Sequence, residues 1–145
     1  LGKEIDISEV FEEGFHVDVR SLTKGKGFQG PVKRHGINLR SHKSEKSRRG
    51  NIRGAWTGAK MWTVPHSGKM GNNQRVDYNK QILKIGTDVK EINPKSGLTK
   101  YGVIKNKFVL VKGSIPGSRK RAITLTYPRR MIRNIENPTI KKIIA

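Results

Sequence analysis

The side chains best suited to acid–base or metal chemistry near neutral pH are the four histidines, His16, His35, His42 and His66. Their spacing matches no metal-ligand pattern, and the chain has neither an H-E-x-x-H motif nor a Ser-His-Asp ordering. The chain also lacks cysteine, which excludes disulfides, thiolate catalysis and cysteine-ligated zinc. We therefore expect no catalytic residue, no metal and no cofactor, and we interpret the histidines as partner contacts or residues of solvated loops.

A glycine-rich segment, TKGKGFQGPVKRHG at 23–36, contains the spacing G-x-G-x-x-G. A dinucleotide site is not expected, because the bases after Pro31 give no amphipathic helix and no acid lies about twenty positions on outside a basic run. Glycines can instead lie close to a phosphate chain that neighbouring cations neutralise. The glycines with this predicted role here are Gly25, Gly27 and Gly30, and the cations are Lys24, Lys26, Lys33 and Arg34. A solvated, flexible loop is the alternative.

The next segment, RSHKSEKSRRGNIRG at 40–54, carries six lysines and arginines against one glutamate. Alone it would be disordered, because it repels itself and has little to bury. Against RNA the same charges gain free energy by releasing counterions, so binding would order the segment. The predicted RNA-binding cations from this segment onward are Arg40, Lys43, Lys46, Arg48, Arg49, Arg53, Lys60, Lys69, Arg75, Arg119, Lys120 and Arg121, and Gly54 is a further point of close backbone approach.

Both tryptophans lie in GAWTGAKMWTVPHSGKMG at 54–71, among glycines and lysines rather than among aliphatic residues. Stacking of an aromatic side chain on an unpaired base is worth about 1–3 kcal/mol. Trp56, between Gly54 and Gly58, is therefore predicted to stack on RNA. For Trp62 a place in a core strand is an equal alternative.

The charge balance points the same way, because the 145 residues hold 31 Lys and Arg against 11 Asp and Glu, a net charge of +20. Residues 15–60 carry twelve of these bases against two acids, whereas residues 1–14 carry one lysine against five acids. Such a balance is typical of polyanion binding. The chain has no run of about 18 apolar residues and no basic amphipathic helix, so no membrane partner is expected. Since no catalytic or cofactor-binding motif is found, no small-molecule substrate is expected either.

The apolar pattern predicts an all-β fold, a small β-barrel or sandwich with a short helix near the N-terminus. That helix, at 5–14, would lie on the surface with Asp6 or Ser8 as its cap. Alternation predicts strands at 15–22 and 121–128, and strand pairing over 75–86 with an irregularity near Asn79. A tight hairpin is predicted at 101–113 with its turn at 105–107, a further strand at 61–65, helix-compatible spacing at 131–135, and a loop without regular structure at 23–60.

These elements predict a single domain over 1–145. The core comprises 15–22 and 61–127, the basic extension comprises 23–60, and the basic tail comprises 128–145. A loop as long as the extension is uncommon in a compact domain without a functional reason.

Four motifs in register, VDVRSLTKGKGFQGPVKRHGI, GAWTGAKMWTVPHSGKMG, QRVDYNKQILKIG and YGVIKNKFVLVKGSIPG, closely resemble large-subunit ribosomal protein three in its archaeal and eukaryotic form. The resemblance covers residues 15 to about 127. It implies a translation-protein-type β-barrel with an extension through large-subunit ribosomal RNA. In that family the extension carries a tryptophan at its tip near the peptidyl-transferase centre, and the matching residue here is Trp56. The resemblance also implies neighbouring large-subunit proteins as partners, a role in subunit assembly, and a cytoplasmic location in the large subunit.

The sequence departs from the family in three places. Archaeal members have N-terminal strands that are absent here, so the chain is expected to be N-terminally truncated or completed by a separate chain. Some relatives carry a methylated histidine twelve positions before the tip tryptophan, where this chain has Ser44. The motif HSGKMGNN at 66–73 differs from the commoner RAGQMGYH.

The sequence thus predicts a non-catalytic ribosomal RNA-binding protein. One alternative is a free RNA or DNA chaperone acting outside the ribosome through the same extension. The other is an enzyme acting on RNA with His66 or His35 as its base, and this would lose turnover when both histidines are replaced by alanine.

Overall fold

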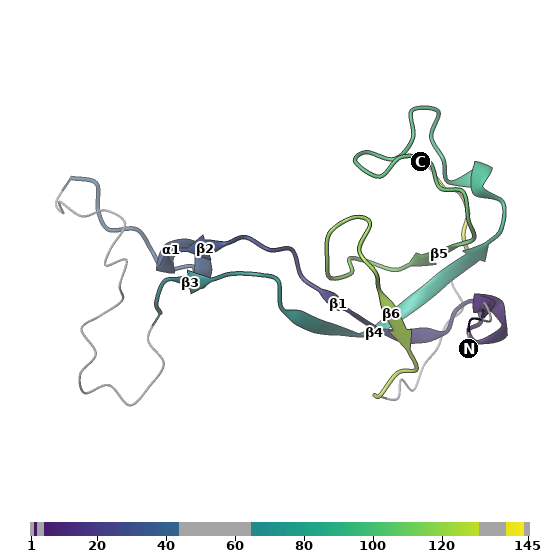
Figure 1. Ribbon diagram of the computed structural model, residues 1–145, viewed down its shortest axis with the longest axis horizontal. Helices are drawn as coiled ribbons and strands as arrows, with labels where there is room; N and C mark the ends of the chain where they lie inside the picture. Colours follow the sequence, from purple (N-terminus) through teal and green to yellow (C-terminus); the bar gives the residue numbers. More distant parts are fainter. Residues whose placement is uncertain (1, 3–4, 44–64, 131–138, 144–145) are drawn as a thin grey trace. The chain divides into compact units, whose positions relative to one another are not determined.

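The computed structural model describes residues 2, 5–43, 65–130 and 139–143, which divide into two compact units. Unit 1 comprises Leu1–Thr23 with Gln74–Ala145, and unit 2 comprises Lys24–Asn73 (Figure 1). The predicted strand at 61–65 and the helix-compatible stretch at 131–135 lie largely or wholly outside the described residues. Each unit is described by itself.

Unit 1 is built on a four-stranded antiparallel sheet. Its strands are β1 (His16–Leu22), β4 (Gln74–Gly86), β5 (Phe108–Val111) and β6 (Thr124–Thr126), and their order is β5-β4-β1-β6 (Figure 1). The two 3₁₀ helices of this unit are η1 (Ile7–Glu9) and η2 (Val89–Glu91). The predicted all-β class is confirmed. Closure of this sheet into a barrel stays a prediction, since β5 and β6 have one paired neighbour each among the described strands.

The long pairing of β1 with β4 is interrupted at the place where the sequence predicts an irregularity. Val17 pairs with Lys80 but Val19 pairs with Asp77, so β4 has an extra residue here. Asn79 takes the left-handed conformation at φ 54°, which asparagine tolerates better than most residues. The bulge bends the strand pair and fixes which side chains face the core.

The core of unit 1 lies on one side of this sheet. Its buried members are Phe11, Val17, Val19 and Ile82, and the partly buried residues packed against them are Ile7, Val10, Phe15, Ile85, Val109 and Leu125. The rings of Phe11 and Tyr127 are 5.4 Å apart, a distance typical of tilted aromatic pairs. The predicted short helix within 5–14 is confirmed only as the 3₁₀ helix η1, and the prediction that the whole segment lies on the surface is wrong, because Phe11 is buried. The segment has one 3₁₀ turn, capped by Asp6, one of the two expected caps, and it contributes Phe11 to the core.

The predicted hairpin at 101–113 does not form. Phe108–Val111 pairs with β4 instead, and Val103 is exposed. Ile104 exchanges two hydrogen bonds with the side chain of Asn93, whose amide nitrogen donates to the Ile104 carbonyl at 2.8 Å and whose oxygen accepts from the Ile104 nitrogen at 2.9 Å. The apolar run at 108–111 gains more free energy of burial by covering the apolar residues of β4 than it would by folding back on 103–104. The predicted strand at 121–128 is also shorter, with ladder pairing at Thr124–Thr126.

Unit 2 contains a short two-stranded ladder of β2 (Phe28–Gln29) and β3 (Gly68–Lys69), and the helix α1 (Pro31–His35). The prediction of a loop without regular structure over 23–60 is therefore wrong at these residues. Pro31 begins the helix, where its missing N–H costs nothing, and Gly36 ends it at φ 67°. Two-residue strands and a five-residue helix leave no periodicity for a sequence pattern to show.

Candidate RNA interface

Backbone hydrogen bonds at one end of the β2–β3 ladder, and a side-chain hydrogen bond from α1, fix the stem of unit 2. The Lys26 nitrogen donates to the Met70 carbonyl and the Met70 nitrogen donates to the Gly27 carbonyl, each at 2.9 Å. The Arg34 guanidinium donates to the His66 carbonyl at 2.9 Å and so ties α1 to the segment that leads into β3. These contacts give the cations of the described stem defined positions.

The glycines of the stem have distinct structural reasons. Gly27 and Gly71 have positive φ angles, 65° and 75°, which favour glycine. A Cβ on Gly71 would lie 1.9 Å from the Lys24 carbonyl oxygen, so two backbone segments meet there. Gly30 differs from both, because a Cβ there would meet nothing within 4 Å and its φ is −72°. Gly25 also has no positive φ, and a Cβ there would make an ordinary contact of 3.7 Å with the Asn72 Cβ, so Gly25 and Gly30 are the described glycines of the predicted set whose identity the fold explains least.

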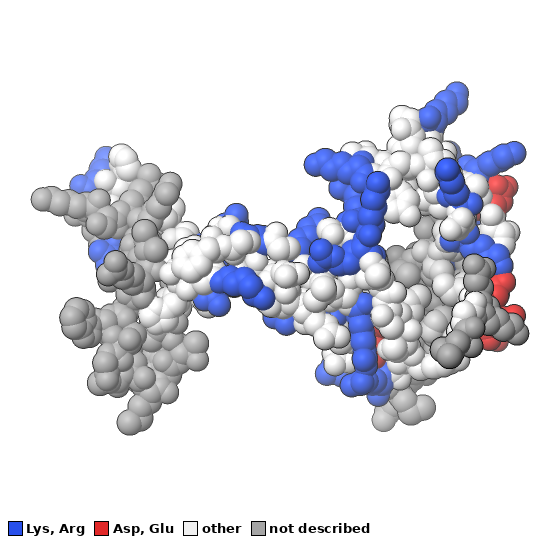
Figure 2. All heavy atoms as spheres, in the orientation of Figure 1, with Lys and Arg blue, Asp and Glu red and all other residues white. Residues whose placement is uncertain are grey.

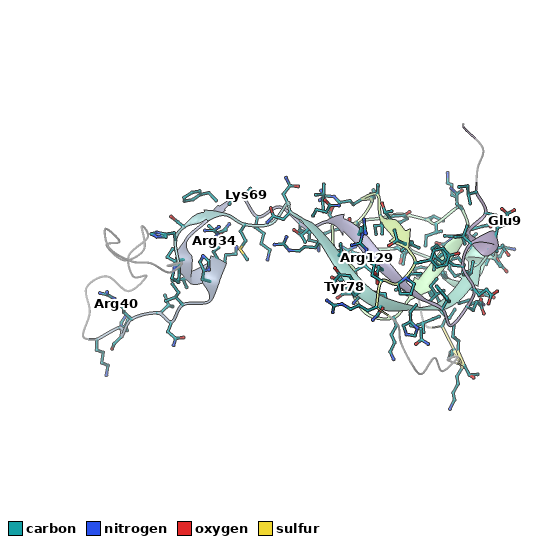
Figure 3. All side chains as sticks on the ribbon, turned by 90° about the horizontal axis from the view of Figure 1, so that it is seen from below. Glu9, Arg34, Arg40, Lys69, Tyr78 and Arg129 are labelled. Carbon is teal, nitrogen blue, oxygen red and sulfur yellow. The ribbon has the colours of Figure 1, made fainter. Side chains whose placement is uncertain are left out.

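The predicted RNA-binding cations of unit 2 are exposed wherever the structure describes them. They are Lys24, Lys26, Lys33, Arg34, Arg40, Lys43 and Lys69. Lys69 also donates to the Asn72 carbonyl, at 3.4 Å. In Figure 3 the labelled Arg34 and Lys69 lie at the ladder and α1. The predicted residues Lys46, Arg48, Arg49, Arg53, Gly54, Trp56 and Lys60, and also Trp62, lie outside the described residues.

The predicted cations of unit 1 have more varied surroundings. Arg119 and Lys120 are exposed. Arg75 is exposed and donates to the Gln74 carbonyl at 3.0 Å. Arg121 is half-buried, and its guanidinium donates to the carbonyls of Leu22 and Thr23 at 3.1 and 3.2 Å. Arg121 therefore holds the end of β1, a structural role that its charge alone did not indicate.

Ion pairs distinguish a second group of lysines, none of which belongs to the predicted set. Among the described residues, Lys80 pairs with Asp77, Lys84 with Glu91 and Lys107 with Asp6. Figure 2 shows acidic atoms mainly at the end of unit 1 that carries η1 and η2, whereas basic atoms are spread over the rest of its visible face. Unit 2 has twelve lysines and arginines against a single glutamate in its sequence. The carboxylate of that glutamate can neutralise only one of these twelve cations.

Sequence reasoning missed a buried carboxylate, Asp18, on β1. The side chain is 0% exposed, and its two oxygens accept hydrogen bonds from the backbone nitrogens of Asn79 and Arg129, both at 3.0 Å. Beside it, the Arg130 guanidinium lies 4.5 Å from the centre of the Tyr78 ring, a cation–π contact. Figure 3 shows Tyr78 and Arg129 close to the paired strands. The alternation of β1 suggested an outward Asp18, since the bulge that encloses it depends on partner strands.

The four histidines are divided between the two units. His16 lies on β1, while His35, His42 and His66 belong to unit 2. In the part of the chain that the structure describes, no group of three His, Asp or Glu side chains is placed to hold a metal ion. Likewise, none of the described helices is long and apolar enough to cross a bilayer.

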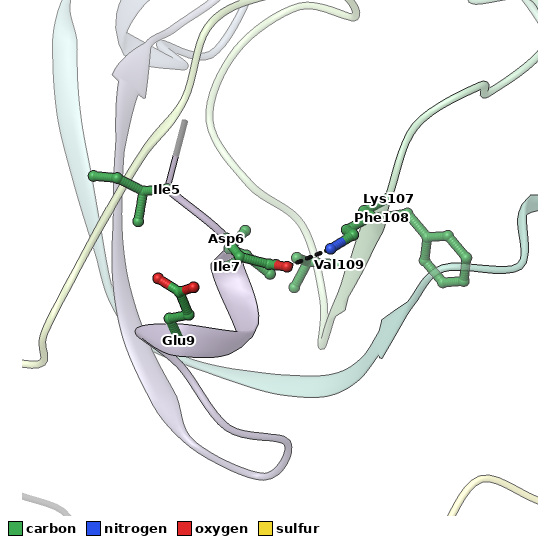
Figure 4. Close-up of a pocket in the computed structure, with 7 residues that line it drawn as sticks. All are labelled: Ile5, Asp6, Ile7, Glu9, Lys107, Phe108 and Val109. Atoms are coloured by element: carbon green, nitrogen blue, oxygen red, sulfur yellow. Dashed lines mark hydrogen bonds and ion pairs between the residues drawn. The ribbon is translucent and has the colours of Figure 1, made fainter. Parts of the chain in front are cut away.

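An open hollow of about 470 Å³ lies between η1 and β5 (Figure 4). It is lined by Ile5, Asp6, Ile7, Glu9, Lys107, Phe108 and Val109. The ion pair of Asp6 with Lys107 crosses it, and the hydrogen bond from Lys107 holds the pKa of the Asp6 carboxyl below its usual value, with a smaller contribution from the Ser8 backbone nitrogen. The pair of Asp6 with Lys107 satisfies one acid and the one base of the lining, and Glu9 is the other charged residue there.

Comparison with known proteins connects these features to a family. The family model described as Ribosomal protein L3 matches residues 1–139. Proteins named large ribosomal subunit protein uL3 are similar to the chain, 47% identical over 99% of it in Methanococcoides burtonii and 51% over 86% of it in Archaeoglobus fulgidus. The relative in Pyrobaculum calidifontis is 50% identical over 90% of the chain.

The chain spans 44% of the length of the Methanococcoides relative and 39% of the other two. The names of these relatives are those of ribosomal proteins and not of enzymes. Both the extent of the family match and the identity to these relatives lead to one conclusion: the chain belongs to the ribosomal protein L3 family.

Proposed function

We propose that this chain is a non-catalytic constituent of the large ribosomal subunit, in the cytoplasm, that binds large-subunit ribosomal RNA through unit 2. The observation that carries the proposal is the charge of that unit, twelve lysines and arginines against one glutamate in a chain of the ribosomal protein L3 family. Phosphates supply the missing negative charge, and counterion release supplies the free energy. The exposed lysines beside the β2–β3 ladder are the proposed phosphate contacts.

Unit 2 is, in this proposal, the extension that passes between RNA helices. The ladder forms its stem, and the glycine backbone approaches the phosphate chain. Gly30 supports this assignment, because neither its φ nor a neighbouring atom of the described chain requires a residue without a Cβ. The core of unit 1 anchors the extension, and the exposed Arg75, Arg119 and Lys120 add contacts on its surface.

The test measures binding of the full chain to transcribed large-subunit ribosomal RNA at several salt concentrations. The test variant replaces Lys24, Lys26 and Lys33 with glutamine, and the control variant replaces Lys80, Lys84 and Lys107, which removes the same charge from carboxylate-paired lysines. Each lost phosphate contact lowers the steepness of log K against log salt by about 0.7–0.9, so the test variant should lose about 2 to 3. Equal losses in the two variants would contradict the assignment to unit 2.

We further propose that Trp56 forms the tip of the extension and approaches the peptidyl-transferase centre. Support comes from the family membership and from the position of Trp56 between Gly54 and Gly58. Replacing Trp56 with alanine should alter A-site tRNA binding in subunits that still assemble. Unchanged tRNA binding would remove the claim. Sedimentation with large subunits in moderately high salt separates this function from that of a free RNA chaperone, which would exchange off the subunit.

A further inference from the structure

The most exposed large aromatic side chain that the structure describes is Phe28, in β2. Its exposed fraction is 74%. A phenyl ring has no polar group that would favour contact with water, so a ring this exposed is a candidate for contact with a partner. Phe28 lies in the most cationic part of the molecule, and the charge pattern that identified the lysines gave no reason to single it out.

The two faces of the β2–β3 ladder differ. Gln29 pairs with Gly68, and a Cβ on Gly68 would lie 2.8 Å from a guanidinium nitrogen of Arg34, so Arg34 covers that face. Phe28 pairs with Lys69. Because directly opposite residues of an antiparallel pair project to the same face, Phe28 and Lys69 share the other face of the ladder.

The backbone that carries Phe28 is held firmly. The bonds between Lys26, Gly27 and Met70 close the ladder on one side, and Arg34 secures the other through the His66 carbonyl. Gly71 lies against the Lys24 carbonyl, where no side chain would fit. The ring is thus presented from an ordered backbone, so a partner that covers it need not order the ladder as well.

We propose that Phe28 stacks on an unpaired base of RNA while Lys69 neutralises an adjacent phosphate. This inference rests on the proposed RNA-binding function and identifies single-stranded RNA as the target of this face. The commitment to RNA follows from charge complementarity, because an apolar ring beside an ammonium group in a unit with one acid suits a flat base joined to a phosphate. Contact between copies of the chain would bring two strongly cationic surfaces together.

The experiment compares Phe28→Ala, Phe28→Leu and Phe28→Trp in the full chain. The probe is a single-stranded RNA oligonucleotide of about 12 nucleotides containing 2-aminopurine, with a duplex of the same length alongside. Loss of one stacked base should weaken single-strand binding about tenfold in the alanine and leucine variants, while the tryptophan variant should bind like the unchanged chain. The salt dependence should not change, since no charge is removed. Leu39→Ala, which truncates another exposed apolar side chain of unit 2, is the matched control and should have no effect.

Three results would overturn the stacking role. They are equal binding by the leucine and tryptophan variants, an equal loss for single strand and duplex, and self-association that disappears in Phe28→Ala. Protection of the Met70 amide from hydrogen exchange shows whether the ladder survives each substitution. If the unchanged chain fails to bind large-subunit ribosomal RNA in the salt experiment above, the proposed function fails. If it binds there but Phe28→Ala binds single-stranded RNA equally well, this inference alone fails.

Discussion

Replacing Asp18 with asparagine should destabilise unit 1 far more than a surface change of the same kind. Asp18 accepts one hydrogen bond at each carboxylate oxygen, from the backbone nitrogens of Asn79 and Arg129. Asparagine keeps one acceptor but turns an amide donor toward the other nitrogen. A hydrogen bond to a charged group contributes about 1.5–3 kcal/mol, and the neutral side chain is less costly to bury, so we expect a net loss of about 2 kcal/mol.

Asp18→Ala removes both acceptors from a fully buried position, and its expected loss is about 4 kcal/mol. The assay is urea unfolding of the full chain followed by circular dichroism, with hydrogen exchange at the Asn79 and Arg129 amides. The matched control is Asp77→Asn, which removes a partly exposed carboxylate from a pair with Lys80 at 3.6 Å and should cost under about 0.5 kcal/mol.

The reasoning about Asp18 would be refuted if Asp18→Asn lost no more than Asp77→Asn. A gain in stability would refute it differently, because it would mean that the cost of burying the charge exceeds the value of its two hydrogen bonds. In either case the bulge at Asn79 would have to be maintained by strand pairing and not by the carboxylate.

Three further outcomes follow from single contacts. Gly71→Ala should disrupt the β2–β3 ladder and weaken RNA binding, because its Cβ would overlap the Lys24 carbonyl oxygen; loss of Met70 amide protection would show this. Lys107→Met should raise the pKa of Asp6 toward its ordinary value, and NMR titration measures this. In the unchanged chain the pair stabilises the fold at pH values above the ordinary Asp6 pKa, and this stabilisation is lost as the pH falls through the lowered Asp6 pKa. The variant should lack this pH-dependent stabilisation. Tyr127→Phe should cost about 1 kcal/mol in urea unfolding, since the hydroxyl donates to a backbone carbonyl at 3.0 Å while the ring contacts persist.

A different result would contradict each of these three predictions. Gly30→Ala, at a position with open space and an ordinary φ, is the control for Gly71→Ala, and equal loss of the ladder in both variants would contradict the steric argument. An unchanged Asp6 titration in Lys107→Met would show that the pairing does not lower that pKa. Tyr127→Phe with unchanged stability would mean that water replaces the carbonyl without cost.

The fold could be predicted where neighbours in sequence decide it. The alternation at 15–22 indicated β1, Asp6 was one of two candidate caps before the first turn, and the irregularity near Asn79 could be predicted from a break in the apolar pattern. The hairpin at 101–113 failed for the opposite reason. Its two apolar runs are compatible with each other locally, but β4 offers the second run a longer apolar partner.

The candidate RNA interface likewise has features that the sequence predicts and features that only the fold decides. Net charge is a sum over residues, so the cationic character of 24–73 and its shortage of acids follow directly from the amino-acid composition of that segment. The surroundings of each cation, by contrast, cannot be obtained by summing over residues. Arg34 and Arg121 are as basic as any predicted contact, yet their guanidinium groups bind backbone carbonyls that are distant in sequence. Phe28 was missed because an aromatic residue between glycines suits an exposed position and a buried one equally well.

The amino-acid sequence alone therefore determined the charge of this protein, its family and the local alternation of its first strand. Folding in three dimensions set the partner of each strand, the enclosure of Asp18, and the choice of which cations face solvent. The physical reason is the distance along the chain over which each property is determined. Charge and alternation depend on a residue and its near neighbours, whereas burial and hydrogen-bond partners depend on segments that meet after the chain has folded, such as the Asp18 carboxylate and the Arg129 nitrogen, 111 residues apart.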